Sequence, residues 1–167
     1  KYISELLKTK YIISTVSNDM IGIEYSSSLK NIYSIMVGIA HGLGYGDNFL
    51  SVLISHCSKE MSDFIKDVHK TNRKINQSAY LGDLLVTTYS SFSRNRTFGN
   101  MIGKGYSIKS AKAEMNMVVE GYYATKNAFM LSKKLSTKFL IIDFCHKILF
   151  ENKSASRQMK ELSKNLY

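Results

Sequence analysis

Apolar residues recur at helical spacing along most of this chain, from about Ser26 onward. Between residues 29 and 40 they stand three or four positions apart, which predicts a first helix behind a serine run that can supply its N-cap. The sequence Gly42-Leu-Gly-Tyr-Gly46 interrupts that helix, and Asp47 can cap a second helix whose apolar face continues to Val68. Because these glycines follow a helix and not a strand, they predict a helix–helix turn instead of a dinucleotide-binding loop.

Shorter helices and polar connections are predicted for the rest of the chain. Serines stand where caps are expected, and apolar residues gather on one face of each segment. In order, the predicted segments are a basic loop at Thr71–Gln77, a short buried helix at Leu81–Val86, a polar loop at residues 90–97, a helix beginning at Ser107, helices over about Val118–Lys133 and Thr137–Phe150, and a last amphipathic helix capped by Ser154.

The first twenty residues have a different pattern. Tyr11–Val16 is rich in β-branched residues and ends at the turn signal Ser17-Asn-Asp19, so it predicts a short strand. No partner strand is evident downstream, and the chain begins with Lys instead of Met, so we expect a piece of a longer polypeptide. We therefore predict an all-α domain over residues 21–167, preceded by residues 1–20 as the trailing edge of an absent domain.

Composition narrows the class of protein. With 167 residues, of which 44% are hydrophobic, the chain can build one domain with a sizeable core. No apolar run approaches the roughly 18 residues that a membrane span needs, so no transmembrane segment is expected. The net charge of +10 suggests nucleic acid as a partner, but the lysines are dispersed and no nucleic-acid motif accompanies them, so we expect no such partner.

The two cysteines, Cys57 and Cys145, are far apart and form no Cys-x-x-Cys pair. Such sparse cysteine usage is typical of a reducing, cytoplasmic compartment with buried thiols. Each cysteine precedes a histidine, but neighbouring residues on a helix point about 100° apart. These pairs therefore do not predict a metal site.

The predicted polar loop at residues 90–97 is unusually dense in hydrogen-bond donors. Ser93, Arg94 and Asn95 combine hydroxyl, guanidinium and amide groups, which are the donors that a phosphate or carboxylate needs. The alternative is a solvated polar turn with two incidental arginines, which composition alone leaves open.

Three further charged residues are candidates for chemistry. Lys30 lies early in the first predicted helix beside apolar positions, where a lysine can serve as a proton donor or simply extend to solvent. Asp83 precedes an apolar run and can cap a helix or orient a nearby ammonium. Glu120 follows an apolar pair and can be an ordinary first-turn helix charge.

Six short motifs, taken in their order along the chain, cover nearly its whole length and can be compared with those of known families. They are Asn18-Asp-Met-Ile-Gly-Ile-Glu24, Leu29-Lys-Asn-Ile32, Gly38-Ile-Ala-His-Gly-Leu-Gly-Tyr-Gly-Asp-Asn48, Leu81-Gly-Asp-Leu84, Phe92-Ser-Arg-Asn-Arg96 and Val118-Val-Glu-Gly121. Together they closely resemble the C-terminal domain of the bacterial type of NAD(P)-dependent glycerol-3-phosphate dehydrogenases. The resemblance implies an all-helical substrate domain of the 6-phosphogluconate dehydrogenase C-terminal type, following a Rossmann domain that is absent here.

The resemblance also implies roles for individual residues. Lys30 matches the catalytic lysine of the family, and Asp83 matches the acidic residue beside it. Lys30 and Asp83 also belong to the implied substrate-binding set, together with Ser93, Arg94 and Asn95, which match the positions that hold glycerol phosphate. The implied cofactor contacts are Arg94, Val118 and Glu120, and Asn31 and Thr87 lie near the site. The implied reaction is the reversible reduction of dihydroxyacetone phosphate to sn-glycerol 3-phosphate for phospholipid precursor synthesis, with NAD or NADP as cofactor.

Two departures from the family pattern lie outside these positions. Ser26-Ser-Ser-Leu29 stands where small residues such as glycine and alanine are usual, and Leu140 stands where proline is common. By the same resemblance, the Rossmann half carries the glycine loop that binds the cofactor phosphates. This chain alone is therefore expected to have no dehydrogenase activity. The alternative reading is a free-standing helical interaction module that has lost catalysis. The sequence leaves the oligomeric state open, a homodimer included.

Overall fold

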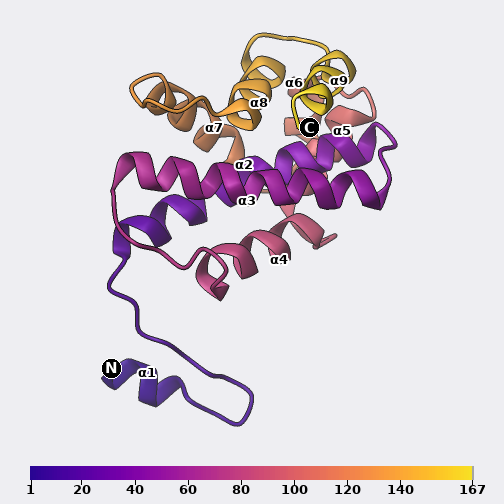
Figure 1. The fold of residues 1–167 in the computed structure, drawn as a ribbon. Coiled ribbons are helices and arrows are strands. Elements are labelled where there is room, and N and C mark those ends of the chain that lie inside the picture. Colours follow the sequence, from indigo (N-terminus) through magenta and orange to yellow (C-terminus); the bar gives the residue numbers. More distant parts are fainter. Residues whose placement is uncertain (167) are drawn as a thin grey trace.

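Two long antiparallel helices form the frame of the domain. The computed structural model describes residues 1–166, and within them α2 spans Met20–Gly42 and α3 spans Asp47–Val68 (Figure 1). The turn between them places Gly44 at φ 88°, a left-handed conformation that glycine adopts without a Cβ clash. The predicted helix–helix turn is therefore confirmed.

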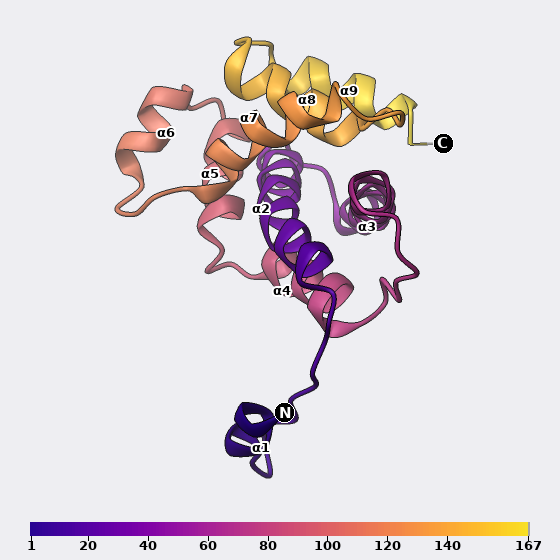
Figure 2. The ribbon, with the colours of Figure 1, turned by 90° about the vertical axis from the view of Figure 1, so that its left-hand side faces the viewer.

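Helix α2 is the central element of the domain. Every residue from 32 to 40 is buried, because other helices surround this part of α2 (Figure 2). The elements that follow α3 are one turn of π-helix, η1 (Ser78–Gly82), and the helices α4 (Asp83–Tyr89), α5 (Arg94–Gly103), α6 (Ile108–Glu114), α7 (Glu120–Ser132), α8 (Leu140–Phe150) and α9 (Ala155–Lys164). The predicted all-helical domain is thus confirmed.

Several helix starts differ from the prediction. Helix α2 begins before the serine run: Asp19 is its N-cap and accepts a hydrogen bond from the Gly22 N–H at 3.1 Å, whereas Ser26 is buried inside the helix. Gly46, and not Asp47, is the N-cap of α3. Where several polar residues adjoin a helix, cap preference alone does not select among them, because packing decides which turn is the first.

Other boundaries agree more closely. Ser107 and Ser154 cap α6 and α9 through their side-chain oxygens, as predicted.

The polar loop predicted at residues 90–97 is wrong in its second half. Ser93 caps α5, so Arg94 and Asn95 lie on the first turn of a helix.

The predicted strand at Tyr11–Val16 is also wrong. The described residues contain no strand, and the N-terminal segment forms α1 (Tyr2–Leu7) and an extended stretch that projects away from the helical domain (Figures 1 and 2). A strand needs a neighbour to pair with its backbone groups. The hydrogen bonds of this stretch stay within the N-terminal segment, as does the 2.9 Å bond between the hydroxyls of Ser4 and Ser14.

Helices α2 and α5 touch through their backbones. Each carries two glycines four positions apart, Gly38 and Gly42 on α2 and Gly99 and Gly103 on α5. A Cβ placed on any of the four would overlap a backbone carbonyl oxygen of the opposite helix. The missing side chains allow this close approach, as they do in other helix pairs with the same glycine spacing. The contact therefore determines the position in space of the first turn of α5 relative to α2.

A largely buried ionic cluster fastens the start of α2 to the segment that leads into α4. Asp19 accepts hydrogen bonds from the Arg73 guanidinium at 2.5 and 2.9 Å and from the Tyr80 hydroxyl at 2.5 Å. These bonds, that of Arg73 foremost, hold the pKa of Asp19 well below its usual range. Because Tyr80 belongs to η1, the cluster also fixes the turn that immediately precedes Asp83.

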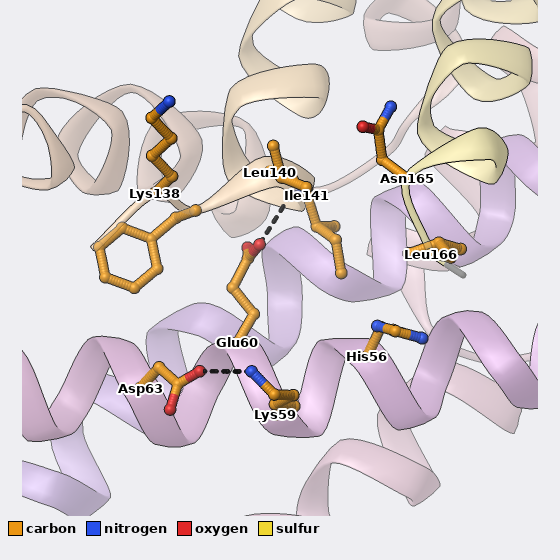
Figure 3. Close-up of a pocket in the computed structure, with 10 residues that line it drawn as sticks. His56, Lys59, Glu60, Asp63, Lys138, Leu140, Ile141, Asn165 and Leu166 are labelled. Atoms are coloured by element: carbon orange, nitrogen blue, oxygen red, sulfur yellow. Dashed lines mark hydrogen bonds and ion pairs between the residues drawn. The ribbon is translucent and has the colours of Figure 1, made fainter.

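A buried carboxyl group holds the start of α8. Glu60 on α3 accepts the backbone N–H groups of Ile141 and Ile142 at 2.8 and 3.0 Å, and Figure 3 shows its carboxyl group pointing to this helix end. Burial raises the pKa of Glu60 to about 7, although the two backbone bonds act in the opposite direction. The α3–α8 contact therefore contains a group that titrates near neutral pH.

We predict that Gly99→Ala destabilises the domain by about 3 kcal/mol, the upper end of the usual cost of overpacking. The added methyl group would overlap the backbone oxygen of Ile35, which cannot move without displacing α2. Gly46→Ala is the matched control, since no atom lies within 4 Å of its Cβ position. It should change the free energy of unfolding in urea by no more than about 1 kcal/mol, the cost of alanine at the N-cap of α3. Equal effects of the two substitutions would contradict the backbone contact.

We predict that Glu60 makes the domain less stable as the pH rises. The folded-state pKa of about 7 lies above the ordinary glutamate pKa of 4.5, so the folded state favours the protonated form. The stabilisation is complete below the unfolded pKa and is lost as the pH rises through about 7. It amounts to at most about 3 kcal/mol.

Glu60→Gln removes this titration, so the free energy of unfolding should vary less between pH 5 and pH 7.5 than in the unsubstituted protein. Asp63→Asn, a half-exposed carboxylate on the same helix, is the control and should retain the original slope. The prediction is wrong if Glu60→Gln and the unsubstituted protein show parallel pH profiles.

Candidate active site

A polar cleft opens where α2, α4, α5 and α7 meet. Its volume is about 460 Å³, and it is lined by Ser27, Lys30, Asn31, Val86, Thr87, Ser90, Phe92, Ser93, Arg94, Asn95 and Glu120. Most of the residues singled out from the sequence are in this set, although they come from four helices and span ninety positions of the chain. The side chain of Val118 does not line the cleft, but this residue lies exposed just before α7.

Lys30 and Asp83 form an ion pair beside the cleft. The Lys30 Nζ lies 2.5 Å from the Asp83 Oδ2, although the residues are 53 positions apart. Lys30 projects from α2, and Asp83 is the first residue of α4, directly after the π-helical turn. The Lys30 side chain is 19% exposed, so the ammonium group is held close to the protein and still reaches the opening. The resemblance implied an acidic residue beside this lysine, and the structure confirms that the two charged groups are adjacent.

Arg94 and Glu120 form a second ion pair across the same cleft. The Arg94 Nη2 lies 2.6 Å from the Glu120 Oε1, and a second guanidinium nitrogen donates to the Met117 sulfur at 3.4 Å. Both charged side chains are between a third and a half exposed. Because exposed pairs of this kind contribute little stability, an anionic ligand can take the place of Glu120 on the guanidinium at small cost.

Asn95 is a junction between three helices. It is 4% exposed, its amide nitrogen donates to the Asn31 Oδ1 at 2.9 Å, and its amide oxygen accepts the Gly121 N–H at 2.9 Å. These bonds join α5 to α2 and to the first turn of α7. One amide proton of Asn95 remains for a ligand in the cleft.

Ser93 caps α5 and at the same time contacts α2. Its hydroxyl oxygen accepts the Arg96 N–H at 3.3 Å and lies 3.0 Å from the Ser34 hydroxyl. Ser34, in turn, donates to the Thr87 carbonyl oxygen at 2.9 Å. Sequence reasoning missed Ser34, because a serine within an apolar helical stretch gives no signal that distinguishes it from an ordinary core residue.

The cleft is lined by two cations, Lys30 and Arg94, the Glu120 carboxylate and several neutral donors, while Asp83 lies outside the lining and pairs with Lys30. Such a set can bind an anionic ligand at Arg94 and supply a proton from Lys30 at a nearby carbonyl group. In the described part of the chain, no group of three or more His, Cys, Asp and Glu side chains is arranged to hold a metal ion.

A family model for the C-terminal domain of NAD-dependent glycerol-3-phosphate dehydrogenase matches residues 19–160. The chain belongs to this family. Among curated glycerol-3-phosphate dehydrogenases [NAD(P)+], that of Fusobacterium nucleatum is 42% identical over 146 residues, covering 87% of this chain and 44% of that protein. The homologue from Chlorobium phaeobacteroides is 38% identical over 160 residues, which cover 96% of this chain and 48% of that protein.

Solved glycerol-3-phosphate dehydrogenases have the same fold. The crystal structure of the Coxiella burnetii enzyme superposes with a TM-score of 0.89 at 31% identity, covering 96% of this chain and 50% of that one. The enzyme of Saccharomyces cerevisiae, at 20% identity and a TM-score of 0.83, shares the fold. The chain thus spans about half the length of the glycerol-3-phosphate dehydrogenases it matches. In the described part of the chain, every helix is too short or too polar to span a bilayer.

Proposed function

We propose that this chain is the substrate-binding and catalytic domain of an NAD(P)-dependent glycerol-3-phosphate dehydrogenase. The whole enzyme would reversibly reduce dihydroxyacetone phosphate to sn-glycerol 3-phosphate, a precursor of phospholipids. The observation that carries the proposal is the convergence of Lys30, paired with Asp83, and of Arg94 and Asn95 on one cleft, within a chain of this family.

Lys30 is the proposed acid of the reaction. When bound, the nicotinamide cofactor supplies the hydride that reduces the carbonyl carbon. Negative charge then grows on the carbonyl oxygen, where the Lys30 ammonium stabilises it and donates a proton. In the reverse direction the neutral Lys30 amine takes the proton of the alcohol. Asp83 would hold the Lys30 side chain in place through their 2.5 Å ion pair.

Arg94 and Asn95 are the proposed phosphate ligands. The Arg94 guanidinium can take two phosphate oxygens once Glu120 moves aside, and Asn95 contributes its remaining amide proton. Ser93 stands at the same helix start. Binding the phosphate at a fixed place would hold the carbonyl group near Lys30. The free energy of phosphate binding would thereby position the reacting group and accelerate the reaction.

The proposed cofactor contacts lie at the edge of the cleft. Arg94 and Glu120 offer donors and an acceptor there, which fit the polar amide of the nicotinamide end of NAD or NADP. Val118, just before α7, would add an apolar contact outside the cleft lining. Among residues 1–166 there is no strand, so the glycine-rich turn at residues 42–46 follows a helix and does not have the context of a dinucleotide-binding loop. The pyrophosphate would therefore be held by a Rossmann domain of the same polypeptide.

Residues 1–20 are the proposed edge of that Rossmann domain. Apolar side chains are exposed throughout this segment, among them Tyr2, Leu6, Tyr11 and Ile13. Large apolar side chains on a projecting segment are typical of a surface that another domain covers. We also propose a cytoplasmic location, in keeping with the two cysteines, which are buried free thiols.

We predict that Lys30→Ala lowers kcat for dihydroxyacetone phosphate by roughly 10²–10⁴-fold, the usual contribution of a positioned acid. Binding of the nicotinamide cofactor should change little, because the substituted group acts on the carbonyl oxygen. Lys59→Ala is the control, since Lys59 is also a helical lysine paired with an aspartate but lies on α3 outside the cleft. Near-normal kcat in Lys30→Ala, measured on the protein with its cofactor domain, would favour the non-catalytic interaction module.

We predict that Arg94→Ala chiefly raises KM for dihydroxyacetone phosphate, by about 10–100-fold, because a charged phosphate contact is lost. A smaller loss of kcat should accompany it as the carbonyl group becomes less well placed. Steady-state kinetics on Arg94→Ala and on the remote control Arg157→Ala separate this effect from general loss of positive charge. An unchanged KM would exclude Arg94 as a phosphate ligand.

A further inference from the structure

Ser34 is a buried hydroxyl group that lies directly beneath the candidate site. It is 0% exposed and lies four residues after Lys30, so the two side chains stand on the same face of α2. Few polar side chains of the described residues are buried to this degree. A buried hydroxyl group persists when its hydrogen bonds are satisfied, and its partners indicate what it holds together.

The directions of the hydrogen bonds around Ser34 follow from the chemistry of the groups. The Thr87 carbonyl can only accept, so the single Ser34 hydroxyl proton points to it, at 2.9 Å. Consequently the proton in the 3.0 Å contact between Ser34 and Ser93 belongs to Ser93. The Ser93 oxygen still accepts the Arg96 N–H. A relay therefore runs from the Arg96 N–H through Ser93 and Ser34 to the Thr87 carbonyl.

This relay joins two helix ends that would otherwise be incomplete. Thr87 lies in the last turn of α4, where carbonyl groups lack helical partners, and Ser93 is the N-cap of α5, where N–H groups lack them. Ser34 connects both ends to α2. The connection is short and its middle residue, Ser34, is fully buried, so it fixes the first turn of α5 relative to the segment of α2 that carries Lys30.

We propose that Ser34 is a positioning residue that sets the distance between Lys30 and the phosphate-holding start of α5, and so sets the preference for a phosphorylated ketone. This inference rests on the proposed function. Ser93 then has an indirect role in phosphate binding. Its proton is committed to Ser34, so Ser93 serves the phosphate mainly by fixing the first turn of α5, on which Arg94 and Asn95 stand.

Ser34→Ala tests the proposal on the protein with its cofactor domain. The readout is the ratio of kcat/KM for dihydroxyacetone phosphate to kcat/KM for dihydroxyacetone, which lacks the phosphate group. Removing one buried hydrogen-bonding group should lower this ratio about tenfold, since about 1.4 kcal/mol corresponds to a factor of ten. Activity toward dihydroxyacetone should fall less than about twofold, because Lys30 is unchanged.

Ser26→Ala is the matched control. Ser26 is equally a buried serine of α2, and its hydroxyl also reaches another element, the Ala79 carbonyl in η1 at 3.3 Å, but it does not contact α5. This variant should keep the substrate ratio of the unsubstituted protein. If Ser26→Ala and Ser34→Ala lower the ratio alike, the effect is one of general stability and the proposal is overturned.

A double variant and an exchange measurement complete the test. If Ser34 and Ser93 act as one unit, Ser34→Ala/Ser93→Ala should lower the ratio no further than the stronger single variant. Backbone amides at residues 95–97 should also exchange with deuterium faster in Ser34→Ala. Unchanged exchange, additive single effects or a higher ratio would each overturn the proposal. An unsubstituted protein that reduces neither ketone would instead overturn the proposed function, and the exchange measurement would still test the relay.

Discussion

Helices α2 and α5 are held against one another by direct contact between their backbones. Glycines at four positions let the two helices approach until carbonyl oxygens occupy the space of the missing side chains. Helix α2 carries Lys30, and α5 begins at Arg94, so one crossing determines the separation of the two cations in the cleft. Because α2 is surrounded by other packed helices, a shift at the crossing has no empty space to relax into.

Four buried or partly buried polar side chains act at helix ends. Asp19 caps α2, Glu60 holds the first amides of α8, Asn95 accepts an amide at the start of α7, and Ser34 joins the end of α4 to the start of α5. Helix ends carry backbone groups without helical partners, so a polar side chain buried there gains hydrogen bonds that it would lack elsewhere in a core. The same contacts orient the helices that carry the cleft residues.

The charges of the cleft are balanced in pairs before any ligand binds. Lys30 has Asp83, and Arg94 has Glu120. The first pair is the more enclosed and is suited to hold an ammonium group in one place. The second is more exposed, so its carboxylate can be exchanged for a ligand anion at little cost. The more enclosed pair therefore holds the Lys30 ammonium in place, whereas the Arg94 guanidinium can exchange Glu120 for a ligand anion.

Helical character could be predicted from the sequence alone, because apolar spacing depends on near neighbours in the chain. The roles of Lys30, Asp83, Arg94 and Asn95 came from the resemblance of short local motifs to a known family, since composition and spacing left ordinary alternatives open for each. Features that depend on distant partners could not be predicted. Tyr11–Val16 has the composition of a strand but no strand beside it, and Asp19 caps α2 while the serine run lies inside it. Ser34 and Glu60 look like ordinary helical residues until folding places Thr87, Ser93 and the start of α8 against them. Local pattern can specify an element, but only packing specifies which helix ends a buried hydroxyl or carboxyl group will meet.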